Sequence, residues 1–556
     1  MRLFKAYYHA KADMRLTYGC AMKYTLSPRK RHLLRIVIPV YPSFNVYSFL
    51  AHTTTSLGAV CVASSAARVE GWEVEVIDEN NLRRYGPLSA SGGADHELIQ
   101  KQRPADVVGF YGGLTSTIPR VFDLARFYKS CGAITVAGGQ HFVDETIPEA
   151  LSSDIDIIAL GEGEETIQEL LRAFTRGDDL SAVAGLVYRE GGTPLRTPAR
   201  PPIQDLDALP LPDFSLLRYA RVTFFPVGRV RGCRMACEFC TVKDTPRYAS
   251  AERLVEQVAR IVETMGGREF FIVDDFFGQD RGETLRLCAL LKSYQEGLGR
   301  RLRFTVQIRL DTARDTELLT AMRNAGINVV AIGFESPIPE ELKAMNKGLR
   351  PAEMVELSRL FHHFGFFVHG MFILGYPMKE GSSYTMSMEE RVAHYRKFIK
   401  ESRIDTIQVL LPIPLPGTAL RERLARQHRI YSRDDLGWEY YDAGFPLFVP
   451  DPPLTAEEMQ RAIRRIMGRY YNARCLGLFI LHILALPYLL VYVLGIKSAW
   501  RRWYRRCRNY VYRFGGSRVV RKWTFQLHKG KFLDRLEQAQ RNIATRVRDT
   551  HGPLDA

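Results

Sequence analysis

The stretch Gly232-Cys-Arg-Met-Ala-Cys-Glu-Phe-Cys240 carries three cysteines, Cys233, Cys237 and Cys240, in a CxxxCxxC spacing. Three thiolates this close together can bind three irons of a [4Fe–4S] cluster and leave the fourth iron without a protein ligand. An open metal position is typical of a catalytic site. The alternatives are three buried thiols or structural zinc, but zinc needs a fourth Cys or His at finger-like spacing, and the next His is His362. The sequence therefore predicts a catalytic iron–sulfur site.

The rest of the composition places this site in a large chain of several domains. A length of 556 residues exceeds what one hydrophobic core usually holds. The six other cysteines stand singly, which suits a reducing compartment. Twelve Lys and Arg residues and no Asp or Glu lie between Lys497 and Leu533, so most of the net charge of +16 belongs to the C-terminal part. Residues 1–33 form a polar, basic extension without the apolar run of a secretory signal.

Residues 34–190 alternate β-branched runs with helical stretches. This alternation predicts an α/β domain with a doubly wound parallel sheet, Rossmann-like and flavodoxin-like, whose ligand binds at the carboxyl ends of the strands. Strands are predicted at 34–40, 72–78, 106–111, 134–139 and 155–160, and helices at 57–69 and 119–131. Candidate binding residues in the turns after these strands are Gly112, Gly113, Gly138, Gly139, His141, Gly161 and Gly163.

A proline-rich linker at 191–221 precedes a second α/β region at 222–425. Six strand–helix units there predict a partial (βα)6 barrel, in which catalytic groups gather at the carboxyl ends of the strands. The predicted strands are 222–230, 270–275, 304–309, 328–336, 367–374 and 406–411, and the predicted helices are 251–264, 283–294 and 316–325. Polar candidates at the strand ends are Asp274, Asp275, Gln307, Arg309, Glu335 and Ser336.

The cysteine spacing, with Phe239 as the aromatic residue before the third cysteine, resembles the radical SAM superfamily. Residues 333–336, 345–348 and 370–377 resemble its cobalamin-linked branch, and the turns at 138–141 and 161–164 resemble the cobalamin (B12)-binding domain fused to many of its members. The resemblance implies that S-adenosylmethionine (SAM) chelates the open iron through its amino and carboxylate groups. One electron from the cluster would then cleave the sulfonium and release a 5′-deoxyadenosyl radical, which abstracts hydrogen from an unactivated carbon.

The resemblance also implies roles for the strand-end residues. Asp274 or Asp275 would accept from the SAM ammonium, Arg309 would pair with the SAM carboxylate, and Glu335 or Ser336 would bind the ribose; Gln307 is a further SAM candidate. The glycine turns and His141 would belong to the cobalamin site. The Asp-x-His-x-x-Gly cobalt-binding motif is absent, since Asp95-His96 does not fit it, so cobalamin is expected without a protein His on the cobalt. The alternative is a vestigial domain that binds nothing.

The C-terminal part divides into a helical subdomain at 426–474 and a tail at 475–556. Cys475–Ile496 is 22 residues without a charge, long enough for a bilayer core. His482, Pro487 and basic flanks on both sides favour a bent, re-entrant or surface-lying membrane segment over a simple span. A buried core helix is the alternative. A following helix should present aromatic residues to the lipid interface, with arginines on the remaining faces; RNA is the rival partner. The predicted aromatic face comprises Trp500, Trp503, Tyr504, Cys507, Val511 and Phe514.

Together these features predict a radical SAM enzyme at the cytoplasmic face of the membrane. The favoured reaction is cobalamin-dependent methylation of a lipid-like or polycyclic substrate, with flavodoxin or ferredoxin as reductant and no nucleic-acid partner. Three alternatives stay open: radical cyclisation or rearrangement of a tetrapyrrole or isoprenoid, tRNA modification, and a membrane-docked cobalamin or metal carrier whose cluster is only structural.

Overall fold

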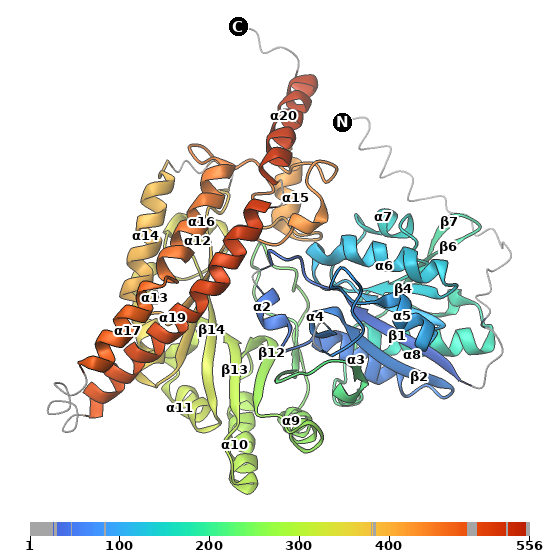
Figure 1. Cartoon of the computed structure of the whole chain (residues 1–556), viewed down its shortest axis with the longest axis horizontal. Helices are drawn as coiled ribbons and strands as arrows, with labels where there is room; N and C mark the ends of the chain where they lie inside the picture. The colour runs from blue at the N-terminus through green and yellow to red at the C-terminus, as the bar shows by residue number, and fades with distance from the viewer. Residues whose placement is uncertain are drawn as a thin grey trace.

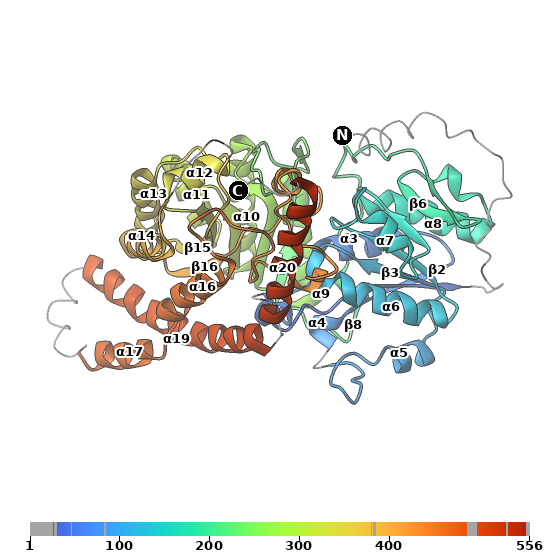
Figure 2. The same ribbon diagram turned by 90° about the horizontal axis from the view of Figure 1, so that it is seen from above.

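The computed structural model describes residues 26, 31–45, 47–82, 85–379, 381, 385–485, 497–529 and 532–551. Two mainly parallel β-sheets lie side by side, one from the first third of the chain and one from the middle (Figure 1). Helices cover both sheets, and the long C-terminal helix α19 lies along the half that holds the second sheet (Figure 2).

The first sheet has eight strands in the order β7-β6-β5-β4-β3-β1-β2-β8. All seven residues of β1 are buried, because helices pack on both faces. The order confirms the predicted doubly wound fold and reverses between β1 and β3, where such sheets bind ligands. The strands are β1 His32–Ile38, β2 Trp72–Asp78, β3 Val107–Tyr111, β4 Ile134–Gly138, β5 Ile157–Ala159, β6 Leu186–Glu190, β7 Thr193–Arg196 and β8 Leu217–Arg218. The helices are α2 Ser48–Ala51, α3 Leu57–Ala66, α4 Glu79–Leu82, α5 His96–Gln102, α6 Ile118–Ser130, α7 Ile147–Leu151 and α8 Gly163–Arg176.

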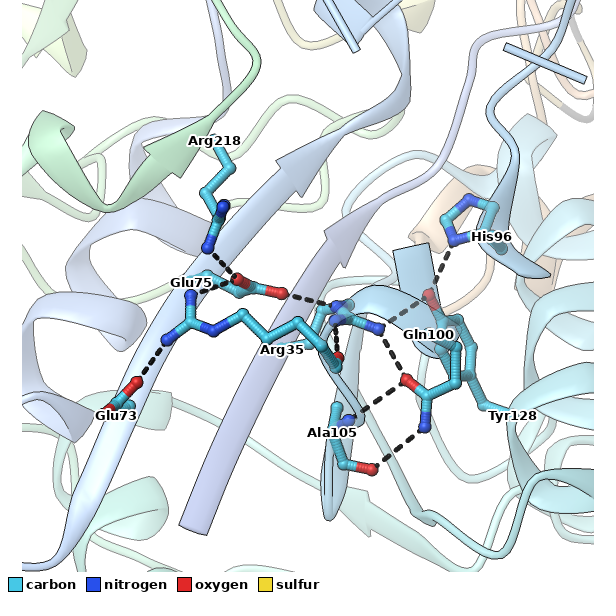
Figure 3. A network of polar contacts seen from close by, with 9 residues as sticks. Arg35, Glu73, Glu75, His96, Gln100, Ala105, Tyr128 and Arg218 are labelled. Atoms are coloured by element: carbon cyan, nitrogen blue, oxygen red, sulfur yellow. Dashed lines mark hydrogen bonds and ion pairs between the residues drawn. The ribbon is translucent and has the colours of Figure 1, made fainter. Parts of the chain in front are cut away.

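A buried polar network fastens β1 to the elements around it (Figure 3). The fully buried guanidinium of Arg35 donates to Glu75 at 2.7 Å and to Gln100 at 2.6 Å, so its charge is paired inside the fold. At the edge of this network, Nδ1 of His96 lies 2.7 Å from the hydroxyl of Tyr128. His96 therefore has a structural place, in line with the missing cobalt-binding motif.

The second sheet has six parallel strands in the order β16-β15-β14-β13-β12-β9, which confirms the predicted (βα)6 partial barrel. Because β9 and β16 each pair with one neighbour only, the barrel is open between them. The strands are β9 Phe224–Val227, β12 Glu269–Phe277, β13 Arg303–Ile308, β14 Ile327–Glu335, β15 Phe367–Ile373 and β16 Thr406–Leu410. The helices around them are α9 Ala251–Met265, α10 Arg281–Leu298, α11 Thr316–Asn324, α12 Pro339–Ala344, α13 Pro351–His363 and α14 Met388–Glu401.

The prediction of one continuous strand at 222–230 is wrong, because the chain forms two separate short strands there. The chain leaves the sheet after β9 and forms a short strand, β10 Val230–Arg231, that pairs with β11 Arg247–Tyr248. The cause is Asp274, whose Oδ1 accepts from the backbone N–H of Arg229 and Val230 at 2.7 and 2.9 Å and so turns this backbone out of the ladder.

Part of the predicted linker 191–221 belongs to the first sheet, because β7 and β8 form its two edges. The residues between them include buried Ile203 and Leu206, which anchor the proline-rich segment to the body.

The described C-terminal tail is helical, as predicted, but residues 427–455 of the predicted helical subdomain are mostly loop, with one short 3-10 turn at Trp438–Tyr440. The helices of the C-terminal part are α15 Ala419–Arg426, α16 Ala456–Tyr470, α17 Arg474–Leu484, α19 Lys497–Lys529 and α20 Phe532–His551. In the described part of the chain, no helix combines the length and the apolar character that a membrane crossing needs. Residues 486–496 of the uncharged segment lie outside the described residues.

The predicted division of α19 into an aromatic lipid face and arginine faces is wrong at three positions. Cys507 is buried. Arg508 forms an ion pair with Asp405 at 3.0 Å, and the guanidinium of Arg513 lies 4.1 Å from the ring centre of Tyr470. These two arginines hold the helix to the barrel and are engaged by protein rather than lipid.

Candidate active site

The cysteine loop runs from β10 to β11 and is fixed from the carboxyl end of β12. The N–H of Gly232 donates to Asp275 at 2.7 Å, and the N–H of Arg234 donates to Gln279 at 2.8 Å. Gly232 has φ of +93°, and a Cβ there would lie 2.6 Å from the carbonyl oxygen of Asp244. Only glycine fits this start of the loop.

The three thiols of the loop are half-buried and lie close enough to influence one another. Burial raises the pKa of Cys240, and the nearby charges of Cys237 and Cys233 raise it further. Burial likewise raises the pKa of Cys237, which Lys347 and Arg309 oppose. Among the described residues, no group of three His, Cys, Asp or Glu side chains converges on one metal ion. The CxxxCxxC spacing of the three thiols within one loop is the pattern that can bind three irons of a cluster.

The far side of the loop rests on a buried ion pair that the sequence alone did not indicate. Arg423 on α15 donates to both carboxylate oxygens of Glu238, at 2.7 and 2.9 Å, and the hydroxyl of Tyr376 donates to Oε2 at 2.8 Å. Phe239 packs edge-on against Tyr376 with ring centres 6.1 Å apart. The sequence could have pointed to Glu238 alone, because it lies inside the cysteine motif. Its partners Tyr376 and Arg423 lie 138 and 185 residues away in the sequence.

Three predicted SAM residues lie on strands, or directly after one, at the end of the barrel that faces the loop: Gln307 on β13, Arg309 directly after it and Glu335 at the end of β14. Arg309 contacts the sulfur of Met235 at 2.8 Å. Gln307 is exposed on β13, and strand alternation places it on the same face as Arg309. Glu335 pairs with Lys347 at 3.0 Å, and both act on the pKa of Cys237. Positive and negative side chains therefore lie beside the thiols, where they could pair with the carboxylate and the ammonium group of an amino acid. Their contact with SAM stays a prediction.

Two other candidates are engaged inside the protein. The buried carboxylate of Asp274 is used by the backbone of the β9–β10 turn, and burial raises its pKa to about 6. Ser336 is fully buried and donates to Glu341, so its hydroxyl belongs to the barrel wall. Asp275 is exposed and holds Gly232 with one carboxylate oxygen. Of the two predicted ammonium acceptors, Asp275 is thus the accessible one.

A cavity of about 750 Å³ lies between the two sheets, at the carboxyl ends of the first sheet. Its lining includes Gly138, Gly139, Gly161 and Gly163 of the predicted cofactor turns. At Gly139 φ is +132°, and a Cβ would lie 2.5 Å from the carbonyl carbon of Gly112, so the two turns touch through bare backbone. This volume is typical of a small-molecule site.

Three predicted cofactor residues are not part of the cavity lining. Gly112 and Gly113 lie behind it and support the turn at Gly139. His141 is buried elsewhere, with its ring 4.9 Å from that of Trp438, and burial together with two arginines lowers its pKa to about 3. The structure therefore gives His141 a place in the packing between the first sheet and the C-terminal subdomain.

The opposite wall of the cavity belongs to the barrel and joins it to the first sheet. Arg231 donates to Glu162 at 2.6 Å and also to Glu164, and Arg247 donates to Glu162 at 2.7 Å. Thr241, directly after Cys240, donates to Gln140 at 3.3 Å. Both ends of the cysteine loop thus border the same cavity as the glycine turns. Sequence reasoning missed these ion pairs, because their partners stand in separate domains.

The cavity fits a large nucleotide-type cofactor by its own features. Backbone without side chains lines one rim, and apolar residues such as Ile36, Val62 and Val136 line the floor. The described His residues include none in the lining, so none of them is placed to bind the metal of a corrinoid in this cavity.

Two protein-family models match the chain. The model described as "Radical SAM superfamily" matches residues 228–412, and the model described as "B12 binding domain" matches residues 49–171. The first match contains the cysteine loop, and the second contains the glycine turns at 138–141 and 161–163.

The chain is also similar to curated proteins. An uncharacterised methyltransferase from Pyrococcus horikoshii is 27% identical over 454 residues, which cover 79% of this chain and 93% of the relative. An anaerobic magnesium-protoporphyrin IX monomethyl ester cyclase from Cereibacter sphaeroides is 25% identical over 361 residues, 62% of this chain and 56% of the cyclase. A hopanoid C-2 methylase from Rhodopseudomonas palustris is 27% identical over 237 residues, 42% of this chain and 43% of the methylase. The matches thus span about half the length of the last two.

A solved structure has the same fold. It is the radical S-adenosylmethionine methyltransferase TsrM from Kitasatospora setae with cobalamin and a [4Fe–4S] cluster bound. The TM-score is 0.56 at 20% identity, covering 72% of this chain and 78% of TsrM.

Proposed function

Because the chain belongs to the radical SAM superfamily and carries an N-terminal B12-binding domain, we propose that it methylates an unactivated carbon of a lipid-like or polycyclic substrate. The protein is a radical SAM enzyme of the cobalamin-dependent, methyltransferase type, and its cofactors are a [4Fe–4S] cluster, SAM and cobalamin. When bound, these groups supply a carbon radical and a methyl group for transfer.

One observation carries the proposal: the cysteine loop and the glycine turns border one cavity. Arg231, Glu162 and Arg247 close its side, and Thr241 meets Gln140 beside the third cysteine. A substrate at the end of this cavity that borders the cysteine loop would lie between the radical source and the methyl source, as a methylation that needs both requires. The protein's own contribution is to hold the two sites in register and to shield the reacting carbon from water.

The substrate class rests on the relatives. Two relatives are named for a hopanoid and for a magnesium-protoporphyrin ester, both polycyclic compounds. These names support, for this chain, a polycyclic or lipid-like acceptor.

The test is an anaerobic assay of the reconstituted enzyme with SAM that carries a trideuterated methyl group. With reductant and a lipid and pigment extract of the source cells, we expect 5′-deoxyadenosine and an extract compound that gains the labelled methyl. Cys233→Ala should abolish both products, whereas Cys131→Ala, at an exposed thiol, should leave both unchanged. Labelled methyl in RNA instead of the extract would contradict the proposal.

Radical cyclisation is the second candidate, because a cyclase is among the relatives. The same assay separates the two reactions. Cyclisation would give 5′-deoxyadenosine and a product that has lost hydrogen and gained no label. An intact cluster without any 5′-deoxyadenosine would favour a carrier.

A further inference from the structure

Helix α17 exposes apolar side chains over more than half of its circumference. Leu481 and Leu484 are 62% and 64% exposed. At 3.6 residues per turn the exposed positions span about 220°, far wider than the stripe that packs into a protein groove. The exposed apolar residues of this helix are Leu476, Leu478, Ile480, Leu481, Ile483 and Leu484.

This apolar helix is held in place by contacts with α19. Trp503 of α19 donates to the carbonyl of His482 at 3.4 Å, and the ring of Tyr510 lies 5.4 Å from that of His482. The ion pair between Arg508 and Asp405 then fastens α19 to the barrel. Figures 1 and 2 show α17 and α19 side by side at the end of the molecule that is remote from the first sheet. The exposed apolar side chains are therefore held on a pair of helices that is fixed to the barrel. We call this pair, described residues 474–485 and 497–529, the α17–α19 hairpin.

Positive charge surrounds the hairpin. Arg474, at the start of α17, and Arg403 and Arg506 are exposed. Burial lowers the pKa of Arg505, and Asp405 opposes this shift. The nearby positive charges of Arg403, Arg508 and Arg506 lower the pKa further. No Asp or Glu occurs from Lys497 to Leu533. The surroundings thus favour a partner that is both anionic and apolar.

We propose that the α17–α19 hairpin docks the enzyme onto an anionic lipid bilayer, with α17 lying in the interface. The 11 residues of α17 make a helix roughly 16 Å long, about half of a bilayer's hydrocarbon core, so α17 is too short to span it and suits a position in the interface. Apolar side chains enter the acyl boundary while arginines meet lipid phosphates. RNA would use the arginines but gives the six aliphatic side chains no role. The docking is independent of the reaction proposed above.

The experiment is co-flotation of the full-length protein with vesicles of phosphatidylcholine alone or with phosphatidylglycerol added. We expect wild-type protein to float with the phosphatidylglycerol vesicles and less with the neutral ones. Leu481→Asp with Leu484→Asp should weaken the partition coefficient by more than about tenfold, because two apolar contacts are replaced by charges that an anionic surface repels. Arg506→Glu should weaken binding to phosphatidylglycerol vesicles and leave neutral ones unaffected.

The control is Leu98→Asp with Met265→Asp, two exposed apolar residues on the body, which should float like wild type. Iron content and SAM cleavage confirm that each variant is folded. Wild-type protein that stays unbound, or a hairpin variant that floats as well as the control, overturns the proposal. So does a wild-type dimer that the hairpin substitutions convert to a monomer, since the occupant would then be a second copy.

Discussion

Single buried charges set the shape of the cysteine loop. Burial alone would raise the pKa of Glu238, but Arg423 and Tyr376 hold it below its usual value. The carboxylate is therefore ionised at neutral pH, and it ties Cys237 and Phe239, its neighbours in the loop, to α15.

Glu238→Gln should loosen this loop. The change leaves the guanidinium of Arg423 buried without a counter-charge, which costs about 1 to 3 kcal/mol of stability. We expect a lower urea midpoint and faster loss of iron from the reconstituted protein. Glu252→Gln breaks an exposed pair with Arg286 and should change neither. A Glu238→Gln protein that retains iron like wild type would show that the loop holds its shape without this pair.

A second residue-scale prediction concerns pH. The carboxyl group of Asp442 accepts from Asn45 at 2.8 Å, and burial raises its pKa to about 8 against the hydrogen bonds from Asn45 and Ser116. The folded protein thus binds this proton more tightly than the unfolded chain. The stability it gives is complete below about pH 4 and is lost as the pH rises through about 8.

Asp442→Asn should remove this loss. Thermal unfolding should show the variant close to wild type at pH 4 and more stable at pH 8, with the gap growing by about 1.4 kcal/mol per pH unit in between. Other titrating groups are shared by the two proteins and cancel in the difference. An equal gap at both pH values would mean that Asp442 is ionised throughout.

At the scale of elements, the turn after β4 is the tightest part of the cofactor rim. Gly139→Ala would place a methyl group against the backbone of Gly112, and the turn must shift to accommodate it. We expect a loss of about 2 kcal/mol or more and much weaker cobalamin binding, read from the visible spectrum of the loaded protein. Gly93→Ala, where a Cβ meets nothing closer than 3.9 Å, is the matched control. Normal cobalamin uptake by Gly139→Ala would place the cofactor away from this turn.

Most strands of both sheets could be predicted from the sequence, because buried parallel strands read as short apolar runs between turns. Of the helices around them, α3, α6, α9, α10 and α11 were predicted. Trp72–Asp78 was predicted to the residue. The exceptions have long-range causes. Asp274 accepts from backbone N–H groups that lie 45 and 44 residues before it in the sequence. Arg508 points toward the barrel because it binds Asp405, which is 103 residues away in the sequence.

The candidate site was predictable where its chemistry is local, in the cysteines and the glycine turns. It was not predictable where two residues of the same type differ only in their burial and contacts. Asp274 is buried and used by the backbone, whereas Asp275 next to it is exposed. His141 looked like a cofactor residue by its motif, yet it packs against Trp438.

At the scale of the whole molecule, the ion pairs of Arg231 and Arg247 with Glu162 join the two sheets around one cavity. Arg231→Met should let the domains shift while the cysteine loop stays intact. We expect 5′-deoxyadenosine to form near the wild-type rate and methylated product to fall by about tenfold or more, since transfer depends on the alignment of the two halves. Arg281→Met, which removes an exposed arginine that also pairs with two carboxylates, should affect neither product. Equal loss of both products would point to damage of the cluster instead.

The central claim is that the cluster and cobalamin face one shared site. Electron paramagnetic resonance of the reduced holoenzyme tests it, with the cluster and the cobalamin both in paramagnetic states. The structure predicts that the two signals broaden each other through space and that Arg231→Met weakens this coupling. A spectrum equal to the sum of the two centres recorded separately would contradict the claim.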